Sequence, residues 1–253
     1  MGRIIYAGFA ANGIAGGQKM LLRHVEALCE LGFQATYRLQ PGRAIPDWLD
    51  HKAPVETGVP FGPEDVLVLP EDAIAAIKQF AVQDHRIVIF CQNQYNFGIA
   101  AVEALDAYPA DRFPRFLAPG PTCAASIKRA YPAAEVIVVP CFADERLFRP
   151  GEPKRDAVAY APRKRPLEAR MIKSLFPRYH PRHARLPWVE LAGMREAAVD
   201  ALAQAADLVA AGGAPLRRYQ EAAFETARRW SYPVFRDALE KAWTRLAPAL
   251  RPA

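Results

Sequence analysis

Residues 3–39, RIIYAGFAANGIAGGQKMLLRHVEALCELGFQATYRL, decide the expected fold. Residues 3–7 are a short apolar run that predicts a buried strand, and a glycine-containing loop follows them. Residues 18–31 carry apolar side chains at helical spacing and stop at Gly32, so we expect a helix there. Residues 33–39 indicate a second strand. The order strand, loop, helix, strand predicts a parallel sheet with a right-handed crossover.

The loop between the first strand and the first helix carries Gly13, Gly16 and Gly17. It does not spell GxGxxG, the spacing typical of dinucleotide-binding loops. Two interpretations remain for Gly16 and Gly17. They form a tight turn that lets the helix pack on the sheet, or they let a ligand approach the backbone closely.

The next part of the chain continues the alternation of strands and helices. Residues 41–64 contain five prolines and are expected to be irregular. Apolar runs then predict further strands and helices, which makes the first half an α/β domain. The expected strands are 65–70, 86–91, 116–118 and 136–140, and the expected helices are 73–83 and 98–105.

Polar side chains follow the strand expected at residues 86–91, beginning with Gln92 and Asn93. Ligands of open α/β sheets bind where parallel strands end, and amides there can hydrogen-bond a polyhydroxylated molecule. The alternative is a loop that caps the following helix.

A segment rich in proline and charge follows Pro140, and we place the domain boundary near residue 150. The expected domains are therefore residues 1–150 and residues 151–253. The second should hold strands 156–161, 188–192 and 207–210, helices 167–176 and 196–206, and a helical region 216–246 that is interrupted at 231–233.

Charge is distributed unevenly between the two expected domains. Residues 1–150 hold 14 Lys/Arg against 16 Asp/Glu, whereas residues 151–253 hold 19 against 11. The second domain therefore favours an anionic partner, and Arg163, Lys164 and Arg165 are its densest cluster. They lie between an expected strand and an expected helix, where unpaired backbone N–H groups also favour anions.

The four cysteines form no CxxC pair, so they indicate reduced thiols and neither a zinc site nor a disulfide framework. His180 and His183 lie in a proline-flanked loop that is better explained as surface than as a metal site. No run approaches the ~20 apolar residues of a membrane-spanning helix. We expect a cytoplasmic protein, with membrane contact limited to the periphery of the inner membrane surface.

Several segments together resemble the retaining, two-Rossmann (GT-B) glycosyltransferases of the family-four type, which use nucleotide-activated sugars. Gly16 and Gly17, followed by a helix that ends in Leu31-Gly32, resemble the family's N-terminal pattern. VIVVPCFADERLFRP, at 136–150, is similar to the hinge signature. YAPRKRPLEARMIKSLF (160–176) and WVELAGMREAAVDALAQAADLVA (188–210) resemble the start of the donor domain. The matching segments span residues 4–210.

The resemblance implies roles for four of these residues. Arg163 and Lys164 match the cations that bind the donor's diphosphate, and Gly16 and Gly17 match the loop that faces the donor phosphates. Such cations offset the charge that builds on the departing nucleotide diphosphate, so they stabilise the transition state more than the ground state.

The resemblance further implies a retaining transfer that requires no metal and no cofactor, with a nucleotide sugar as substrate. Gln92 and Asn93 lie where acceptor-side polar residues are expected. The acceptor is a saccharide, a lipid or a protein, and the pattern assigns no catalytic residue.

The chain departs from the family pattern after residue 210. The family carries two glutamates separated by seven residues there, whereas this chain runs from Gly213 into Pro215. Its single pair at that spacing is Glu56 and Glu64, in the proline-rich excursion. The donor domain therefore looks shortened, with three clear strands where a complete Rossmann half has five or six. A degenerate, non-catalytic nucleotide-sugar-binding protein of the same fold is thus an alternative to an active enzyme.

A basic nucleic-acid-binding protein is the second alternative. Residues 163–185 hold eight Lys/Arg and two histidines against one acid, Glu168. The segment has no recognised nucleic-acid motif and few aromatic residues, Phe176 and Tyr179, so we do not expect nucleic acid as the partner.

Overall fold

The computed structural model describes residues 2–8, 16–47, 49–106, 108–142, 158–160, 166–190, 221–222, 225–226 and 228–250. The chain divides into two compact units. The first unit comprises Met1–Asp144 with Trp230–Ala253, and the second comprises Glu145–Arg229. Each unit is described by itself below.

The first unit is built on a seven-stranded parallel sheet in the order β3-β2-β1-β4-β5-β6-β7. Its strands are β1 (Ile4–Ala7), β2 (Ala35–Leu39), β3 (Val55–Thr57), β4 (Val66–Pro70), β5 (Arg86–Phe90), β6 (Arg115–Ala118) and β7 (Val136–Val138). Its longer helices are α1 (Gly16–Glu30), α2 (Ile74–Ala81), α5 (Pro121–Ala130) and α9 (Tyr232–Leu246). The α/β class expected from the sequence is confirmed.

Strand order places β1 between β2 and β4. The chain proceeds from β1 outward through β2 to β3, then returns to the other side of β1 and proceeds outward through β4 to β7. The order therefore reverses between β1 and β4, and ligands of open α/β sheets bind at this point, beyond the carboxyl ends of the strands.

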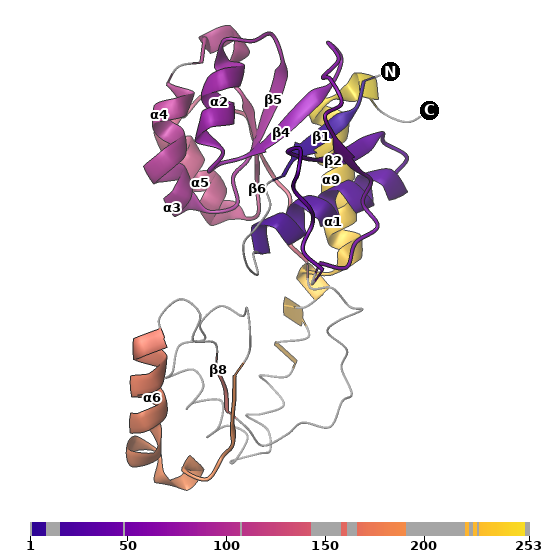
Figure 1. The fold of residues 1–253 in the computed structure, drawn as a ribbon. Helices are drawn as coiled ribbons and strands as arrows, with labels where there is room; N and C mark the ends of the chain where they lie inside the picture. The colour runs from indigo at the N-terminus through magenta and orange to yellow at the C-terminus, as the bar shows by residue number, and fades with distance from the viewer. Residues whose placement is uncertain are drawn as a thin grey trace. The chain divides into compact units, whose positions relative to one another are not determined.

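Both faces of the central strands are buried, because β1, β4, β5 and β6 are largely apolar and their successive side chains point to opposite faces of the sheet. On β1, Ile4 and Tyr6 join one core cluster and Ile5 joins the other. On β4, Val68 and Leu69 divide in the same way. Figure 1 shows α1 and α9 on one side of the sheet and α2, α4 (Val102–Leu105) and α5 on the other.

Helix α1 ends where the sequence predicts. Gly32 adopts φ +87°, a left-handed conformation that favours glycine. Its N–H donates to the carbonyl of Cys29 at 3.0 Å, and the N–H of Phe33 donates to that of Leu28 at 2.9 Å. These two bonds form a Schellman motif, which satisfies carbonyls at the end of the helix and turns the chain into β2.

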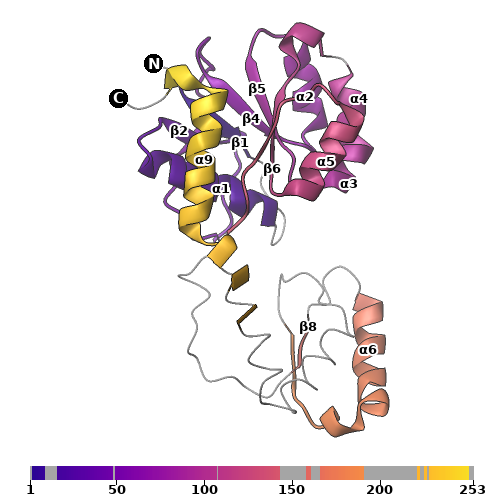
Figure 2. The ribbon, with the colours of Figure 1, turned by 180° about the vertical axis from the view of Figure 1, so that it is seen from behind.

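Helix α9 packs on the first unit, although the sequence placed it in the second domain. Its fully buried face includes Phe235, Leu239 and Trp243, which join the same core as α1. Trp243 Nε1 donates to the Tyr6 hydroxyl at 3.3 Å. Figure 2 shows α9 running beside α1. The expected domain of residues 151–253 therefore differs from the structure, because residues 230–253 group with residues 1–144.

Two local expectations also differ from the structure. The prediction that residues 41–64 are wholly irregular is wrong, since β3 pairs with β2 as the sheet's edge strand. The helix expected at residues 98–105 begins earlier, at α3 (Gln94–Asn96), and continues through a π-helical segment (Phe97–Ala101) into α4 (Val102–Leu105). Short 3₁₀ turns, Ala110–Arg112 and Pro248–Leu250, complete the first unit.

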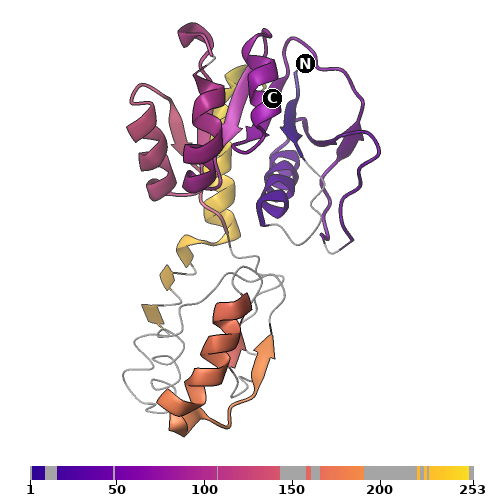
Figure 3. The same ribbon diagram turned by 60° about the vertical axis from the view of Figure 1, so that its left-hand side comes forward.

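The second unit is described for β8 (Val158–Tyr160), α6 (Pro166–Tyr179), a 3₁₀ turn (Pro181–His183) and β9 (Trp188–Glu190). The two strands pair in parallel, and Figure 3 shows α6 beside them. Val158 and Phe176 form the buried centre of this group, with Trp188 packed against them. The expected helix 196–206 and strand 207–210 lie outside the described residues.

Candidate functional site

Three elements of the first unit meet at the carboxyl edge of the sheet. Helix α1 starts there, because it runs antiparallel to the strands that it covers. Strands β4 and β5 end there, at Pro70 and Phe90. The polar residues that follow these two strands lie near the point where the strand order reverses.

Gly16 and Gly17 are the first two residues of α1. A Cβ built on Gly16 has no atom of the described residues within 4 Å, whereas one on Gly17 lies 3.3 Å from Nε2 of Gln92. The structure thus brings together a glycine and an amide that the sequence singled out for separate reasons. The first turn of α1 carries no acidic residue, so no side chain of that turn offsets the positive end of the helix dipole.

Gln18, the next residue, is fully buried. Neither Nε2 nor Oε1 of its side chain has a hydrogen-bond partner among the described residues. A buried, unpaired amide costs about 1–3 kcal/mol, so such a group calls for an explanation. Gln18 shares the buried face of α1 with Leu21 and Val25 and is the member nearest the carboxyl edge.

Glu71 directly follows β4 and is 3% exposed. Its carboxylate accepts a hydrogen bond from the backbone N–H of Gln92, with 2.9 Å between the two heavy atoms. Burial raises the pKa of Glu71, the bond from Gln92 N–H opposes that rise, and neighbouring Asp72 adds to it. Glu71 therefore fixes the backbone that carries the Gln92 side chain, and it ties the end of β4 to the end of β5.

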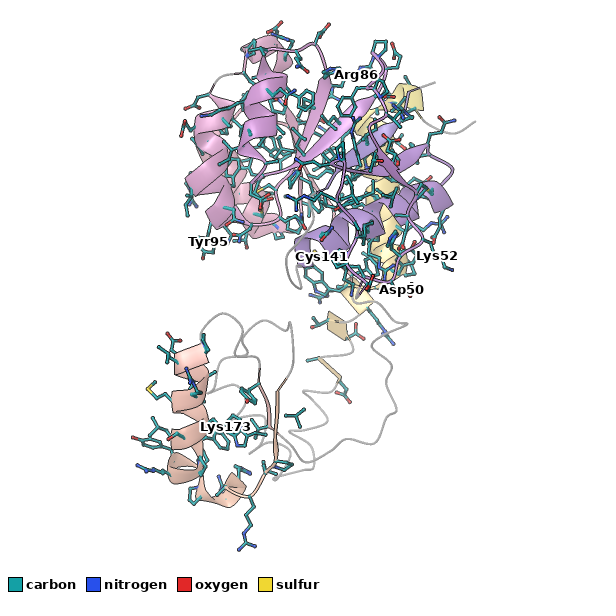
Figure 4. The ribbon with its side chains drawn as sticks, viewed as in Figure 1. Asp50, Lys52, Arg86, Tyr95, Cys141 and Lys173 are labelled. Atoms are coloured by element: carbon teal, nitrogen blue, oxygen red, sulfur yellow. The ribbon has the colours of Figure 1, made fainter. Side chains whose placement is uncertain are left out.

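Asn93 has the capping role that the sequence left open. Its Oδ1 accepts the N–H of Tyr95 at 2.9 Å and so caps α3. Tyr95 itself is 71% exposed and points outward (Figure 4). Of the two acceptor-side candidates, Gln92 is the one that lies against α1.

A cavity of about 590 Å³ opens at the carboxyl ends of β1, β2 and β4, beside α2. Its lining is largely apolar, including Leu67 and Leu69, with Arg38 and Asp72 among its charged members. The Arg38 guanidinium lies 4.1 Å from the centre of the Phe61 ring, which also lines the cavity. Cavities of this size and mixed character suit small ligands.

Arg163 and Lys164, the expected diphosphate ligands, lie outside the described residues. The elements that flank them in the sequence are described: β8 ends at Tyr160, and α6 begins at Pro166. Lys173 points from α6 toward β8 and lies 5.1 Å from the centre of the Tyr160 ring (Figure 4).

The glutamates with the spacing of the family's acidic pair have other partners. Glu56, on β3, pairs with Arg3 at 3.2 Å, and Glu64 pairs with Arg86 at 3.1 Å. Both pairs lie in the first unit, so neither glutamate is a candidate for the donor role.

The described part of the chain holds no group of three or more His, Cys, Asp and Glu side chains arranged to bind a metal. His183 is buried at 8% exposure, and its backbone N–H donates to the backbone carbonyl of His180 at 2.9 Å. No helix within the described ranges combines the length and apolar character needed to cross a membrane.

Gln18 and Glu71 are members of this site that the sequence did not single out. The signal for Gln18 is a polar residue on the apolar face of the first helix, three positions before Leu21. The signal for Glu71 is a carboxyl immediately after an apolar strand, the placement that drew attention to Gln92.

No protein-family model and no curated protein matches this chain. The solved structures that match it include two of an α-glucosyltransferase in complex with UDP and a 13-mer DNA containing an HMU base. One is 15% identical with a TM-score of 0.36 and covers 64% of this chain. The other is 14% identical with a TM-score of 0.41 and covers 75%. This chain spans 49% and 57% of the length of these two proteins. The α/β class therefore rests on the seven-stranded parallel sheet itself.

Proposed function

We propose that this protein binds a nucleotide-diphosphate sugar and transfers the sugar to an acceptor. The observation that carries the proposal is the approach of Gly17 to Gln92 at the carboxyl edge, where the strand order reverses. A glycine at a helix start leaves the backbone open to an anionic group, and the amide beside it offers both a donor and an acceptor to sugar hydroxyls.

The donor diphosphate requires positive charge, and we assign this role to Arg163 and Lys164. They fall between β8 and α6, in the order strand, cations, helix. In the transfer step these cations offset the negative charge that develops on the departing nucleotide diphosphate. Retention of configuration and independence from metals remain predictions of the resemblance.

The acceptor is proposed to enter the cavity beside α2. The apolar wall formed with Leu67 and Leu69 suits the less polar part of an acceptor, while Arg38 and Asp72 supply polar contacts. A saccharide, a lipid or a protein side chain each satisfies this description.

Calorimetric titration of UDP- and GDP-sugars into the wild-type protein tests the donor assignment. We expect Arg163→Ala/Lys164→Ala to weaken binding at least about tenfold, because hydrogen bonds to charged groups contribute about 1.5–3 kcal/mol each. The control is Arg178→Ala/Arg185→Ala, which removes the same charge from exposed positions of the second unit. Equal affinity in the two double variants contradicts the assignment.

A non-catalytic nucleotide-sugar-binding protein is the second candidate. It is favoured by the ion pairs that occupy Glu56 and Glu64, which leave the acidic pair of the family without a counterpart at that spacing. A measurement of nucleotide-sugar turnover distinguishes the sugar-transferring enzyme from the non-catalytic binding protein. Binding without sugar transfer and without hydrolysis of the donor supports the second candidate and contradicts the first.

A further inference from the structure

Cys91 and Cys123 come from different elements and meet beside the candidate site. Cys91 follows β5, and Cys123 is the third residue of α5. Their sulfur atoms are 3.3 Å apart, and Cys123 Sγ also lies 3.1 Å from the carbonyl oxygen of Cys91. Both residues are reduced in the structure and almost fully buried.

We propose that Cys91 and Cys123 are a site of reversible oxidation, where a peroxide converts the two thiols into a disulfide that weakens ligand binding at Gln92. A disulfide needs a sulfur separation of about 2.05 Å, so the two sulfur atoms must approach by about 1.3 Å. That movement is within reach of side-chain rotation with a small shift at the end of β5.

The placement of Cys123 favours its thiolate as the attacking group. The residue lies in the first turn of α5, where backbone N–H groups and the helix dipole stabilise negative charge. That turn carries no acidic residue. The contact with Cys91 lowers the pKa of Cys123, and the same contact together with burial raises the pKa of Cys91.

The reaction balances with hydrogen peroxide as the oxidant. The Cys123 thiolate attacks one peroxide oxygen, the O–O bond breaks, and a sulfenic acid forms as hydroxide leaves. The Cys91 sulfur then attacks the sulfenyl sulfur, and the oxygen leaves as water. The Cys91 proton leaves with that water, and the proton that Cys123 released on becoming the thiolate neutralises the hydroxide. The two thiols thus lose two electrons in total, and the peroxide becomes two molecules of water.

The disulfide acts on the site because Gln92 directly follows Cys91. The Gln92 N–H is bonded to Glu71, and its side-chain amide lies against Gly17. Drawing Cys91 toward α5 displaces Gln92 from these two partners. The effect on nucleotide-sugar binding rests on the proposed function, whereas formation of the disulfide does not.

The test uses the full-length Cys29→Ser/Cys141→Ser variant, in which Cys91 and Cys123 are the remaining thiols. After treatment with hydrogen peroxide we expect the intact mass to fall by two hydrogen atoms, both thiols to stop reacting, and dithiothreitol to reverse both changes. Further substitution of Cys123 by serine should abolish the loss of two hydrogens. A protein that keeps both thiols, or that gains only oxygen atoms, overturns the proposal.

The functional arm compares nucleotide-sugar affinity before and after oxidation in the same variant. We expect binding to weaken about tenfold, since misplacing a positioning group by about 1 Å has effects of this order or larger. Unchanged affinity in a fully oxidised sample overturns the coupling to Gln92. If the reduced protein binds no nucleotide sugar while the disulfide forms, the proposed function fails and the oxidation site stands.

Discussion

Gly17 and Gln92 lie against each other at the carboxyl edge of the sheet, where a Cβ on Gly17 would come within 3.3 Å of the Gln92 amide nitrogen. The two residues are 75 positions apart in the sequence. The reversal of strand order between β1 and β4 brings the start of α1 to the end of β5. The neighbouring carboxylate of Glu71 then holds the Gln92 backbone at 2.9 Å.

Gly17→Ala should separate stability from binding. The added methyl group must displace the Gln92 amide by a few tenths of an ångström, because the contact is tighter than ordinary packing. Alanine favours the helix by up to about 1 kcal/mol over glycine, so the free energy of unfolding should stay equal or rise while nucleotide-sugar affinity falls. The comparison variant is Gly16→Ala, whose Cβ meets no atom of the described residues within 4 Å and so leaves the Gln92 amide in place. Equal affinities in calorimetry for the two variants would contradict the role of this contact.

Glu71→Gln should raise stability at pH 7. Burial raises the pKa of Glu71 in the folded state, so the folded protein holds this proton more tightly than the unfolded chain does. This proton contributes favourably to the free energy of unfolding. The contribution is complete at pH values below the pKa of Glu71 in the unfolded chain, and it is lost as the pH rises through the pKa of Glu71 in the folded state. Glutamine keeps an oxygen to accept the Gln92 N–H.

Urea unfolding at pH 7 and near pH 4 measures this effect. The advantage of Glu71→Gln should be largest at pH 7 and shrink toward pH 4, where the wild-type carboxyl is mostly protonated in both states. Glu64→Gln, which removes an exposed ion pair with Arg86, should change stability by less than about 1 kcal/mol. A gain from Glu71→Gln that is the same at both pH values argues against burial as its cause.

His24 should make the first unit sensitive to acid. Burial lowers the pKa of His24 to about 3. In the unfolded chain the His24 ring has the ordinary pKa of 6.5. The contribution of the neutral ring to the free energy of unfolding is therefore complete above that pH, and it is lost as the pH falls toward 3. The slope for one proton is about 1.4 kcal/mol per pH unit.

The arrangement around His24 supports a neutral ring. Trp243 Nε1 donates to the Tyr6 hydroxyl, and this hydroxyl shares a hydrogen bond of 3.1 Å with His24 Nδ1, in which the tautomer of the neutral ring sets the donor. His24→Phe should therefore lower stability at pH 7 through the lost bond but flatten the decline between pH 6 and pH 4. Parallel acid slopes for the wild type and His24→Phe, measured by urea unfolding, exclude His24 as the source.

Trp243→Ala should test the attachment of α9 to the first unit. Trp243 is fully buried against Tyr6, and truncating a buried tryptophan costs about 3–5 kcal/mol. Trp230→Ala is the matched control, because Trp230 is 39% exposed and its loss should cost far less. Thermal and urea unfolding measure the loss of unfolding free energy in each variant. Similar costs at the two positions would contradict the packing of α9 on this core.

The sequence predicts most of the first sheet because each central strand is a continuous apolar run. Strand β4 and strand β5 are recovered to within a residue or two for this reason. Strand β3 was missed because it is short, has exposed Val55 and Thr57, and depends on pairing with β2, which no local pattern encodes.

The sequence predicts a helical region at residues 216–246 with an interruption at 231–233, but periodicity does not identify what the buried face of its last part, α9, covers. The contact of Trp243 with Tyr6 joins residues 237 positions apart. The site shows the same limit. Gly17 and Gln92 were recognisable singly. Their contact, the bond from the Gln92 N–H to Glu71 and the Gln18 amide, which is unpaired among the described residues, arise only from the folded chain.

Hydrogen exchange with and without a bound nucleotide sugar tests the central claim most directly. Amide exchange is measured by mass spectrometry at a saturating concentration of the sugar nucleotide identified by calorimetry. The account predicts slower exchange in peptides that cover residues 16–20 and 91–96, at the start of α1 and the end of β5. Protection confined to other parts of the chain, with these two segments unchanged, would contradict a ligand site at the carboxyl edge.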